Sequence, residues 1–415
     1  MDDVLNSATR RDFLVGTAAA TLTPLLVSET AAQTTDAPAD AKLYIQPYLQ
    51  NPTADAMTIC FAALAADDVR VRWGKDKTAL TETARLTSSA IPKVTWRVWK
   101  ARLEKLNAAQ TYYYRVDYRE NGEERSSEIY TFTPFDPQGK EVRAVIYNDV
   151  HDRIATAEAL VKLVKPSDFE FSILLGDMWN DPSVANNARQ ALVNLEAYVR
   201  LFDGSNKPML FIRGNHDVRG SFAGQLSHLV DFPGSDPAAP FAEQKAYFDF
   251  LLGPCWFIAP DSGEDGSKKM ELFQPYRQQQ TEWLTGLFAN SSERSATWRI
   301  LLTHIPLYYR GFWDAAHSRD LWEPVLRGAK IDLCISGHIH KYDLIAKDKE
   351  IVHVVDKTKP DETTIRHTPP FATVIGGGPS LPEATVTFFT ASEKQLRVRA
   401  LDAQGREVVK FEQER

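Results

Sequence analysis

Between residues 43 and 135 the hydrophobic positions alternate with polar ones along short segments. Three of these segments are rich in aromatic and β-branched residues: 57–61, 69–73 and 112–116. The Asn-Gly pair at 121–122 is typical of a tight turn between strands. Because the alternation has period two and no long helical pattern interrupts it, this region is predicted to be a small all-β sandwich.

The pattern changes after a stretch rich in Pro and Gly at 134–139, which we interpret as a domain boundary. Helical patterns at 154–164 and 185–202 follow, separated by short apolar runs that do not alternate cleanly. Such runs are typical of strands buried on both faces, so the pattern predicts an α/β domain. The apolar runs are 142–147, 171–175, 208–212, 300–302 and 331–335, and antiparallel strands are predicted at 384–389, 395–401 and 408–412.

Composition narrows the classes of protein that fit this pattern. Hydrophobic residues make up 43% of the 415 residues and charged residues 25%, which is ordinary for a globular protein and excludes a polytopic membrane protein. The net charge of −7 disfavours general nucleic-acid binding. The three cysteines, Cys60, Cys255 and Cys334, form no CxxC pair, so neither a disulfide framework nor a Cys-based zinc site is expected. The cysteine content is compatible with a single disulfide bond and also with buried free thiols.

The first 32 residues have the features of a removable export signal. Arg10 and Arg11, followed by Phe13 and Leu14, resemble the twin-arginine motif. The apolar stretch 13–27 is too short to span a bilayer as a helix, and it contains a proline. We therefore expect a signal peptide at 1–32 and a flexible linker at 33–42. These features predict a periplasmic or secreted protein that is handled by the twin-arginine export machinery and has no stable membrane span once mature.

Polar motifs follow five of the apolar runs in the α/β region. Their side chains offer carboxylate, amide and imidazole groups and no thiolate, a donor set that suits Mn, Fe, Zn or Co. A set of this size is sufficient for two ions, and two adjacent ions can stabilise both the attacking and the leaving oxygen of an in-line displacement. The motifs are Asn148-Asp149-Val150-His151, Gly176-Asp177, Gly214-Asn215-His216-Asp217, Thr303-His304 and Gly337-His338-Ile339-His340.

The order and strand context of these motifs resemble the calcineurin-like metallophosphoesterases across residues 142 to about 380. The preceding sandwich, which looks like a fibronectin-type-III domain, makes the layout similar to purple acid phosphatases. The resemblance implies a β-sandwich core flanked by helices at 141–415, preceded by a small all-β sandwich at 43–135. It also implies a metal-dependent hydrolase that acts on phosphate esters of small molecules.

The resemblance implies a role for each motif residue. Two divalent or mixed-valence ions of Mn, Fe or Zn would share one carboxylate, and a water between them would attack the phosphoryl group in line. The implied ligands are Asp149, His151 and His340 for the first ion, Asn215, His304 and His338 for the second, and Asp177 for both.

Three further residues complete the predicted site. His216 would act as the general acid, oriented by Asp217, and Arg219 could bind the substrate phosphate. Two positions depart from the family pattern. Asn148 stands one position before the first implied ligand, where the family often has a smaller residue. The metal-binding tyrosine of the purple enzymes falls three residues after the shared aspartate, where this chain has Asn180. We therefore expect no tyrosinate-to-iron charge transfer and no purple colour.

Two other functions fit the same sequence. The chain could be a periplasmic binding protein that keeps the fold without turnover, although the complete set of ligands argues against this. It could also hydrolyse a nucleotide or a pyrophosphate in place of a simple mono- or diester. The motifs define the reacting centre and leave the substrate open.

Overall fold

The computed structural model describes residues 43–64, 67–92, 94, 96–120, 122–182, 188–234, 245–265, 270–290, 294–310, 315–354 and 364–415. The chain divides into two compact units, Met1–Asp40 and Ala41–Arg415, and every described residue belongs to the second. The predicted signal peptide at 1–32 and linker at 33–42 lie outside the described residues. None of the helices in the described part is both long enough and apolar enough to cross a membrane.

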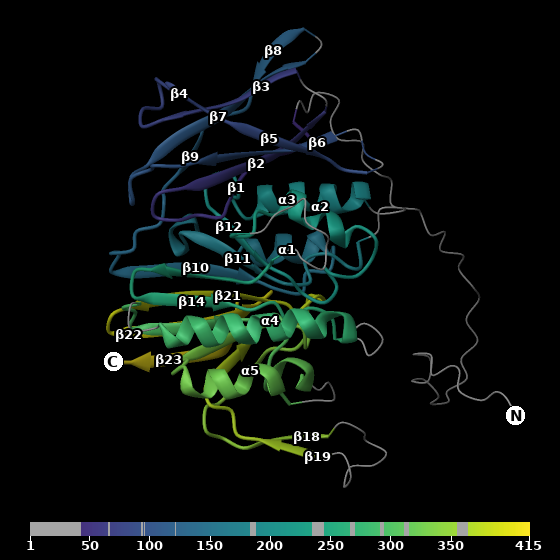
Figure 1. The fold of residues 1–415 in the computed structure, drawn as a ribbon, viewed down its shortest axis with the longest axis vertical. Coiled ribbons are helices and arrows are strands. Elements are labelled where there is room, and N and C mark those ends of the chain that lie inside the picture. Colours follow the sequence, from purple (N-terminus) through teal and green to yellow (C-terminus); the bar gives the residue numbers. More distant parts are fainter. Residues whose placement is uncertain are drawn as a thin grey trace, which may run out of the picture. The chain divides into compact units, whose positions relative to one another are not determined.

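The N-terminal region is a sandwich of two antiparallel sheets, as the alternating pattern predicts (Figure 1). Alternate residues of each sheet, such as Ile59 and Phe61, point into the core between them. The first sheet has the order β1 (Ile45–Gln50), β2 (Met57–Leu64), β6 (Trp96–Leu103), β5 (Leu86–Ala90). The second has the order β4 (Glu82–Ala84), β3 (Asp67–Gly74), β7 (Tyr112–Glu120), β8 (Glu123–Ser126), and β9 (Tyr130–Phe132) also pairs with β7.

The first of these sheets is buried on its second face as well. Cys60 and Ala62, which alternate with the inward residues of β2, pack into the core of the following domain. Across the same contact the Tyr48 hydroxyl donates a hydrogen bond to the Leu229 carbonyl at 2.6 Å. Apolar burial and specific hydrogen bonds therefore both fix the sandwich to the α/β domain.

Two six-stranded sheets form the centre of the second domain. The first has the order β12 (Met209–Ile212), β11 (Phe171–Leu175), β10 (Glu141–Tyr147), β21 (Thr385–Ser392), β22 (Gln395–Asp402), β23 (Glu407–Glu414). The second has the order β13 (Phe248–Leu252), β14 (Cys255–Ala259), β15 (Trp298–Leu302), β16 (Leu333–Ser336), β20 (Ala372–Ile375), β17 (Asp343–Ile345). The strands β10, β11 and β12 are parallel to one another, as are β14, β15, β16 and β20.

The two sheets pack face to face, and helices cover their outer faces (Figure 1). On β14, Cys255 and Phe257 point into the core between the sheets, whereas Trp256 and Ile258 pack toward the helices. Both faces are therefore apolar, which explains why the sequence shows continuous runs here. The helices are α1 (Ile154–Val161), α2 (Ala188–Leu201), α3 (Leu226–Leu229), α4 (Met270–Ala289) and α5 (Ala316–Gly328), and β18 (Ile351–Val354) and β19 (Thr364–His367) form a separate hairpin.

The predicted fold class, an α/β domain behind a small all-β sandwich, is confirmed. The first predicted helix is shorter than expected, because it ends at Val161 and not at 164. The three cysteines are free and buried, which decides between the two alternatives that the sequence left open.

One partly buried carboxylate between the domains makes the free energy of unfolding depend on pH. Glu196 of α2 accepts a hydrogen bond from the Gln46 amide at 2.8 Å, and burial raises the pKa of Glu196 to about 7. The unfolded chain releases this proton near pH 4.5. The stabilisation that protonated Glu196 gives the folded state is therefore complete below pH 4.5 and is lost as the pH rises through about 7.

Glu196→Gln keeps an acceptor oxygen and removes this loss. The variant is expected to be more stable than the wild type by about 1–2 kcal/mol at pH 8, with the difference shrinking toward zero at pH 4.5. Urea unfolding of both proteins at the two pH values measures it. A difference that does not change with pH would show that Glu196 does not titrate in this way.

Candidate metal centre

The five polar motifs meet because parallel strands end at the same edge of a sheet. The first three motifs follow β10, β11 and β12 of one sheet, and the last two follow β15 and β16 of the other. Ligands in open α/β folds bind outside the carboxyl ends of such strands. The edges of the two packed sheets therefore bring together residues that lie up to 191 positions apart, from Asp149 to His340.

The backbone turns sharply at the residues that leave these strands. Asp149, His151, Asp177, His338 and His340 all have positive φ angles, between 47° and 71°. Asp and His tolerate this left-handed region better than most residues, but clusters of such angles are uncommon outside functional sites. The chain adopts them here because each turn directs a side chain inward at the strand end.

Gly214 is required by the same close packing. A Cβ atom at this position would lie 2.1 Å from Asp177 Oδ1, so any larger residue would displace the carboxylate. The glycine of this motif therefore has a steric role beside the central side chain of the site.

Each of the two central carboxylates has one satisfied oxygen and one unsatisfied oxygen. Asp149 Oδ2 accepts hydrogen bonds from Asn148 Nδ2 at 2.6 Å and from the His338 amide at 2.8 Å. Asp177 Oδ1 accepts one from the His216 amide at 2.8 Å. Asp149 Oδ1 and Asp177 Oδ2 are buried and accept no hydrogen bond from any described residue. Buried oxygens of this kind are costly unless they are paired or coordinate a cation.

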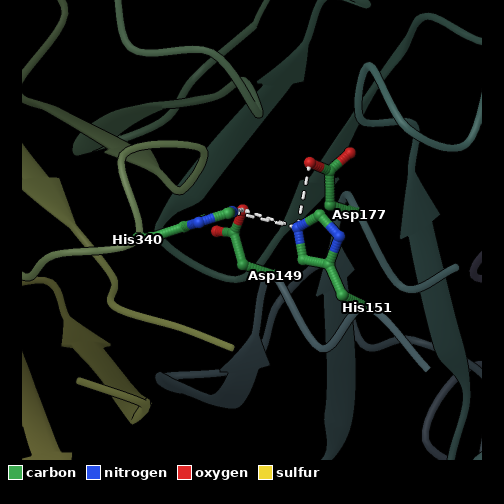
Figure 2. Close-up of side chains that lie close together, drawn as sticks. All are labelled: Asp149, His151, Asp177 and His340. Carbon is green, nitrogen blue, oxygen red and sulfur yellow. Dashed lines mark hydrogen bonds and ion pairs between the residues drawn. The ribbon is translucent and has the colours of Figure 1, made fainter. Parts of the chain in front are cut away.

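Imidazole nitrogens surround these two unsatisfied oxygens. His304 Nε2 lies 3.1 Å from Asp177 Oδ2 and also has no hydrogen-bond partner among the described residues. His151 Nε2 lies 3.4 Å from the same oxygen, and His340 Nε2 lies 3.4 Å from Asp149 Oδ1 (Figure 2). The other nitrogen of His304 lies 2.9 Å from the Leu175 carbonyl, which fixes the ring and leaves Nε2 as the inward donor atom.

The charges of this cluster depend strongly on one another. Burial opposes the charge of His304, but Asp177 and Asp149 outweigh it and raise the His304 pKa to about 9. The same two carboxylates raise the pKa of His151 to about 10 against the effect of burial. Burial and the nearby His304 charge instead lower the pKa of His338 to about 3. The buried carboxylates thus attract positive charge, whether from protons or from metal ions.

The geometry groups the donors into two sets that share one residue. Within each set, the candidate donor atoms all lie within 4.8 Å of one another. Asn215 adds an amide oxygen to the second set, because its Oδ1 lies 2.9 Å from His338 Nδ1. Carboxylate, amide and imidazole donors without thiolate fit hard or borderline divalent ions, so the donors present fit a pair of such ions. The sets are Asp149, His151, Asp177 and His340, and Asp177, His304 and His338.

Comparison with known proteins agrees with this geometry. Residues 142–342 match the family described as calcineurin-like phosphoesterase, and residues 44–134 match the N-terminal domain of purple acid phosphatase. The chain carries a calcineurin-like phosphoesterase domain behind a purple acid phosphatase N-terminal domain.

Relatives and solved structures of this kind are distant in sequence. Purple acid phosphatase 22 of Arabidopsis thaliana is 24% identical over 60% of this chain and 53% of its own length. Purple acid phosphatase 1 of Ipomoea batatas is 26% identical over 42% of this chain and 37% of its own. The chain thus spans about half the length, or less, of these curated relatives. The structure of purple acid phosphatase PPD1 from yellow lupin seeds has a TM-score of 0.66 at 16% identity, over 89% of this chain and 74% of that one, which shows the shared fold.

One predicted role in the phosphoesterase domain is wrong. Asp217 does not orient His216: its Oδ2 accepts hydrogen bonds from the amides of Asp177 and Gly214, both at 2.8 Å, and its Oδ1 accepts one from Trp179. Asp217 is fully buried and fixes the backbone that presents Asp177. It is a positioning residue for the shared carboxylate.

The partner of His216 is Asp181, which the sequence motifs did not indicate. Asp181 Oδ1 lies 2.7 Å from His216 Nδ1, and Asp181 itself has a φ angle of 52°. Its only sequence signal was its position four residues after Asp177, outside any strand. Asn180, which precedes it, places Oδ1 3.3 Å from His151 Nδ1.

Arg219 lies beside the site, but carboxylates already hold its guanidinium. Its Nε lies 2.9 Å and 3.0 Å from the two oxygens of Glu264, and its Nη2 lies 2.5 Å from Asp265 Oδ1. Its Nη1 lies 3.1 Å from His216 Nε2. A substrate phosphate would have to compete with these carboxylates, so substrate binding by Arg219 stays a prediction.

Asn148 is a further contact that the motifs did not reveal. Besides its hydrogen bond to Asp149, its Oδ1 occupies the space next to Gly376, where a Cβ atom would approach to 2.1 Å. The glycine run at 376–378 therefore closes around the start of the first ligand motif. It packs against Asn148 and Asp149 and forms part of the wall of the centre.

Proposed function

We propose that this protein hydrolyses phosphate esters of small molecules at a centre of two metal ions. The observation that carries the proposal is the meeting of three buried, unsatisfied donor atoms: Asp149 Oδ1, Asp177 Oδ2 and His304 Nε2. Two bound divalent ions would supply Lewis acidity, lowering the pKa of water and offsetting charge on the phosphoryl group.

The proposed ligands follow the two donor sets. Asp177 belongs to both, so its unsatisfied oxygen is the group that can hold the two ions together. The hydrogen bonds to the other oxygen of Asp149 and of Asp177 leave a single oxygen of each carboxylate for metal. The full proposed set is Asp149, His151 and His340 for the first ion, Asn215, His304 and His338 for the second, and Asp177 for both.

His216 is the proposed proton donor to the leaving group. Its Nδ1 faces Asp181, which would hold a proton at that nitrogen. The proton donated to the leaving group would be carried by Nε2, which would have to give up its present contact with Arg219 Nη1 at 3.1 Å. The ring packs edge-on against His151 with 4.6 Å between ring centroids, which places it at the first ion's proposed ligands. His216 therefore lies beside the proposed metal ligands and is not needed as one of them.

The proposed ions need not include the redox-stable iron of a purple enzyme. Asn180 lies where the purple enzymes have their tyrosine, and its side chain contacts His151. Protein loaded with Fe(III) is therefore expected to lack an intense visible band from tyrosinate-to-iron charge transfer. An absorption spectrum of the iron-loaded protein measures this, and a purple colour would contradict the assignment of this position.

We also propose that the protein is exported through the twin-arginine system, from the Arg10-Arg11 motif at its N-terminus. Replacing both arginines with lysine, which keeps the charge, is expected to retain the protein in the cytoplasm. Fractionation of the producing cells measures this, and unchanged export would contradict it.

Activity with defined metals tests the proposed function. Protein stripped with a chelator is expected to lose turnover of p-nitrophenyl phosphate or bis-p-nitrophenyl phosphate and to regain it with Mn, Zn or Fe. Pyrophosphate and a nucleotide in the same assay decide between the substrate classes that the sequence left open. No turnover with any metal or substrate would favour a binding protein on this fold.

A further inference from the structure

We propose that Asp265 is a positioning residue that orients His338 toward the second metal ion; the inference rests on the proposed function. Asp265 Oδ2 lies 3.4 Å from His338 Nε2. The other ring nitrogen, Nδ1, lies 2.9 Å from Asn215 Oδ1. Two different groups thus contact the two nitrogens of one imidazole.

These two contacts decide which nitrogen of His338 faces the ion. Asn215 is itself a proposed ligand of the second ion, so the nitrogen next to its oxygen, Nδ1, lies on the metal side of the ring. Nε2 then carries the proton and donates toward Asp265. Carboxylates that hold the outer nitrogen of a metal-binding histidine fix its tautomer and ring orientation and strengthen it as a ligand.

Asp265 is held in place from both sides. Its Oδ1 lies 2.5 Å from Arg219 Nη2, so the two oxygens of the carboxylate have different partners. Arg219 is in turn fixed by Glu264, whose Oε1 lies 2.6 Å from the same Nη2. The carboxylate of Asp265 is therefore not a mobile surface group, and its Oδ2 is left for His338.

The segment that carries Asp265 is anchored in the interior. We call residues 261–265 the acidic strap. Its first residue, Asp261, is fully buried and forms an ion pair with Arg213, with 2.8 Å between Oδ2 and Nε. Gln280 of α4 accepts a hydrogen bond from the Asp261 amide at 2.7 Å, and Arg277 donates to the Ser262 carbonyl at 2.9 Å. The strand end and α4 thus fix where the strap presents its last carboxylate.

Asp265 is not a candidate ligand in its own right. It belongs to neither of the two donor sets whose atoms lie within 4.8 Å of one another, so its contact with the centre runs through His338. Through Arg219, whose Nη1 lies 3.1 Å from His216 Nε2, the same carboxylate also connects the second half of the metal site with the proposed proton donor.

The test measures binding of the second ion. Metal-stripped wild type, Asp265→Ala, Asp265→Asn and Glu264→Gln would be titrated with Zn²⁺ against a competing chelator, and with Co²⁺ while its visible absorption is recorded. Glu264→Gln is the matched control, because it removes a neighbouring charge of the strap but keeps an oxygen that can accept the hydrogen bonds of Arg219, so the anchor of Asp265 is retained. Asp265→Asn has nearly the same shape and keeps an oxygen that can accept the Nε2 proton.

Asp265→Ala is expected to lower the affinity for the second ion about 10- to 100-fold and to change the affinity for the first ion by no more than about twofold. The Co²⁺ bands of the second site should shift in this variant. Asp265→Asn should recover most of the affinity, and Glu264→Gln should bind as the wild type does. At saturating metal, turnover by Asp265→Ala should return toward the wild-type level.

The inference would be overturned if Asp265→Ala bound the second ion with wild-type affinity. It would also be overturned if Glu264→Gln lost as much affinity as Asp265→Ala, because the effect would then belong to the strap as a whole. Either result leaves the proposed function intact if the wild type still binds two ions and turns over substrate. A wild type that takes up no second ion overturns the proposed function together with this inference, so the two failures differ.

Discussion

Asp177→Asn is expected to lose both metal ions and at least about 10³-fold in kcat/KM, since bound ions supply several kcal/mol of charge stabilisation. Asp177 Oδ2 is the donor atom that the two proposed sets share, and it lies 3.1 Å from His304 Nε2 and 3.4 Å from His151 Nε2. The amide removes the negative charge that attracts the cations, while its oxygen can still accept the hydrogen bond from the His216 amide.

Elemental analysis of the purified variant, beside its activity at saturating metal, measures this effect. Asn148→Ala is a useful control, because it removes a hydrogen bond to Asp149 without removing a proposed ligand. It should bind the first ion more weakly than the wild type does, but it should still bind both ions. Unchanged metal content in Asp177→Asn would contradict the assignment of Asp177 as the shared ligand.

His216→Ala is expected to keep both ions and to lose about 10²–10⁴-fold in kcat, the usual contribution of a general acid. The separation of metal binding from turnover follows from the geometry: His216 contacts Asp181 and Arg219 and belongs to neither donor set. The loss should be large with a poor leaving group such as phenol and much smaller with p-nitrophenol, which leaves without a proton.

Asp181→Asn provides the matched variant. It keeps a hydrogen-bond partner for His216 Nδ1 and removes the charge, so it should show a smaller loss with the same dependence on the leaving group. Full activity of His216→Ala toward phenyl phosphate would show that another group donates the proton. Loss of metal from His216→Ala would instead show that His216 is a ligand.

The sequence was sufficient to predict which strands carry the site. Apolar runs such as 171–175 coincide with buried strands, because a strand packed on both faces places nearly all of its side chains in an apolar core. The polar residues that follow each run then lie at one edge, since the strands are parallel. The convergence of Asp149 and Asp177 follows from these two facts. His304 joins them because its own sheet packs against theirs, which the sequence pattern did not show.

The motifs could not predict the contacts that surround the proposed ligands. Three of the contacting residues lie on loops, where no periodic pattern fixes the direction of a side chain: Asp181, Asp265 and Arg219. Asp217 shows that adjacency in the sequence is also a poor guide to contacts. It follows His216 directly, which suggested a contact between them, but the turn directs its side chain to three backbone amides. Neighbours in a tight turn point in different directions.

The contact between the N-terminal sandwich and the next domain is evident only in three dimensions. The alternation along β2 predicted one buried face, and the structure buries both, with Phe61 inside the sandwich and Cys60 against the next domain. A residue such as Cys60 is small and apolar enough to fit either a core or an interface, so the pattern alone could not assign it. The ion pair of Lys100 with Asp231, at 3.2 Å, belongs to the same contact.

The most direct test of the proposed centre is a crystal structure of metal-loaded protein with anomalous data collected at the absorption edge of the metal. Two peaks about 3.5–4 Å apart are expected, with Asp177 Oδ2 between them. Asp149, His151 and His340 should contact one peak, and Asn215, His304 and His338 the other. A single peak, or two peaks that do not share Asp177, would contradict a two-metal phosphoesterase centre at these strand ends.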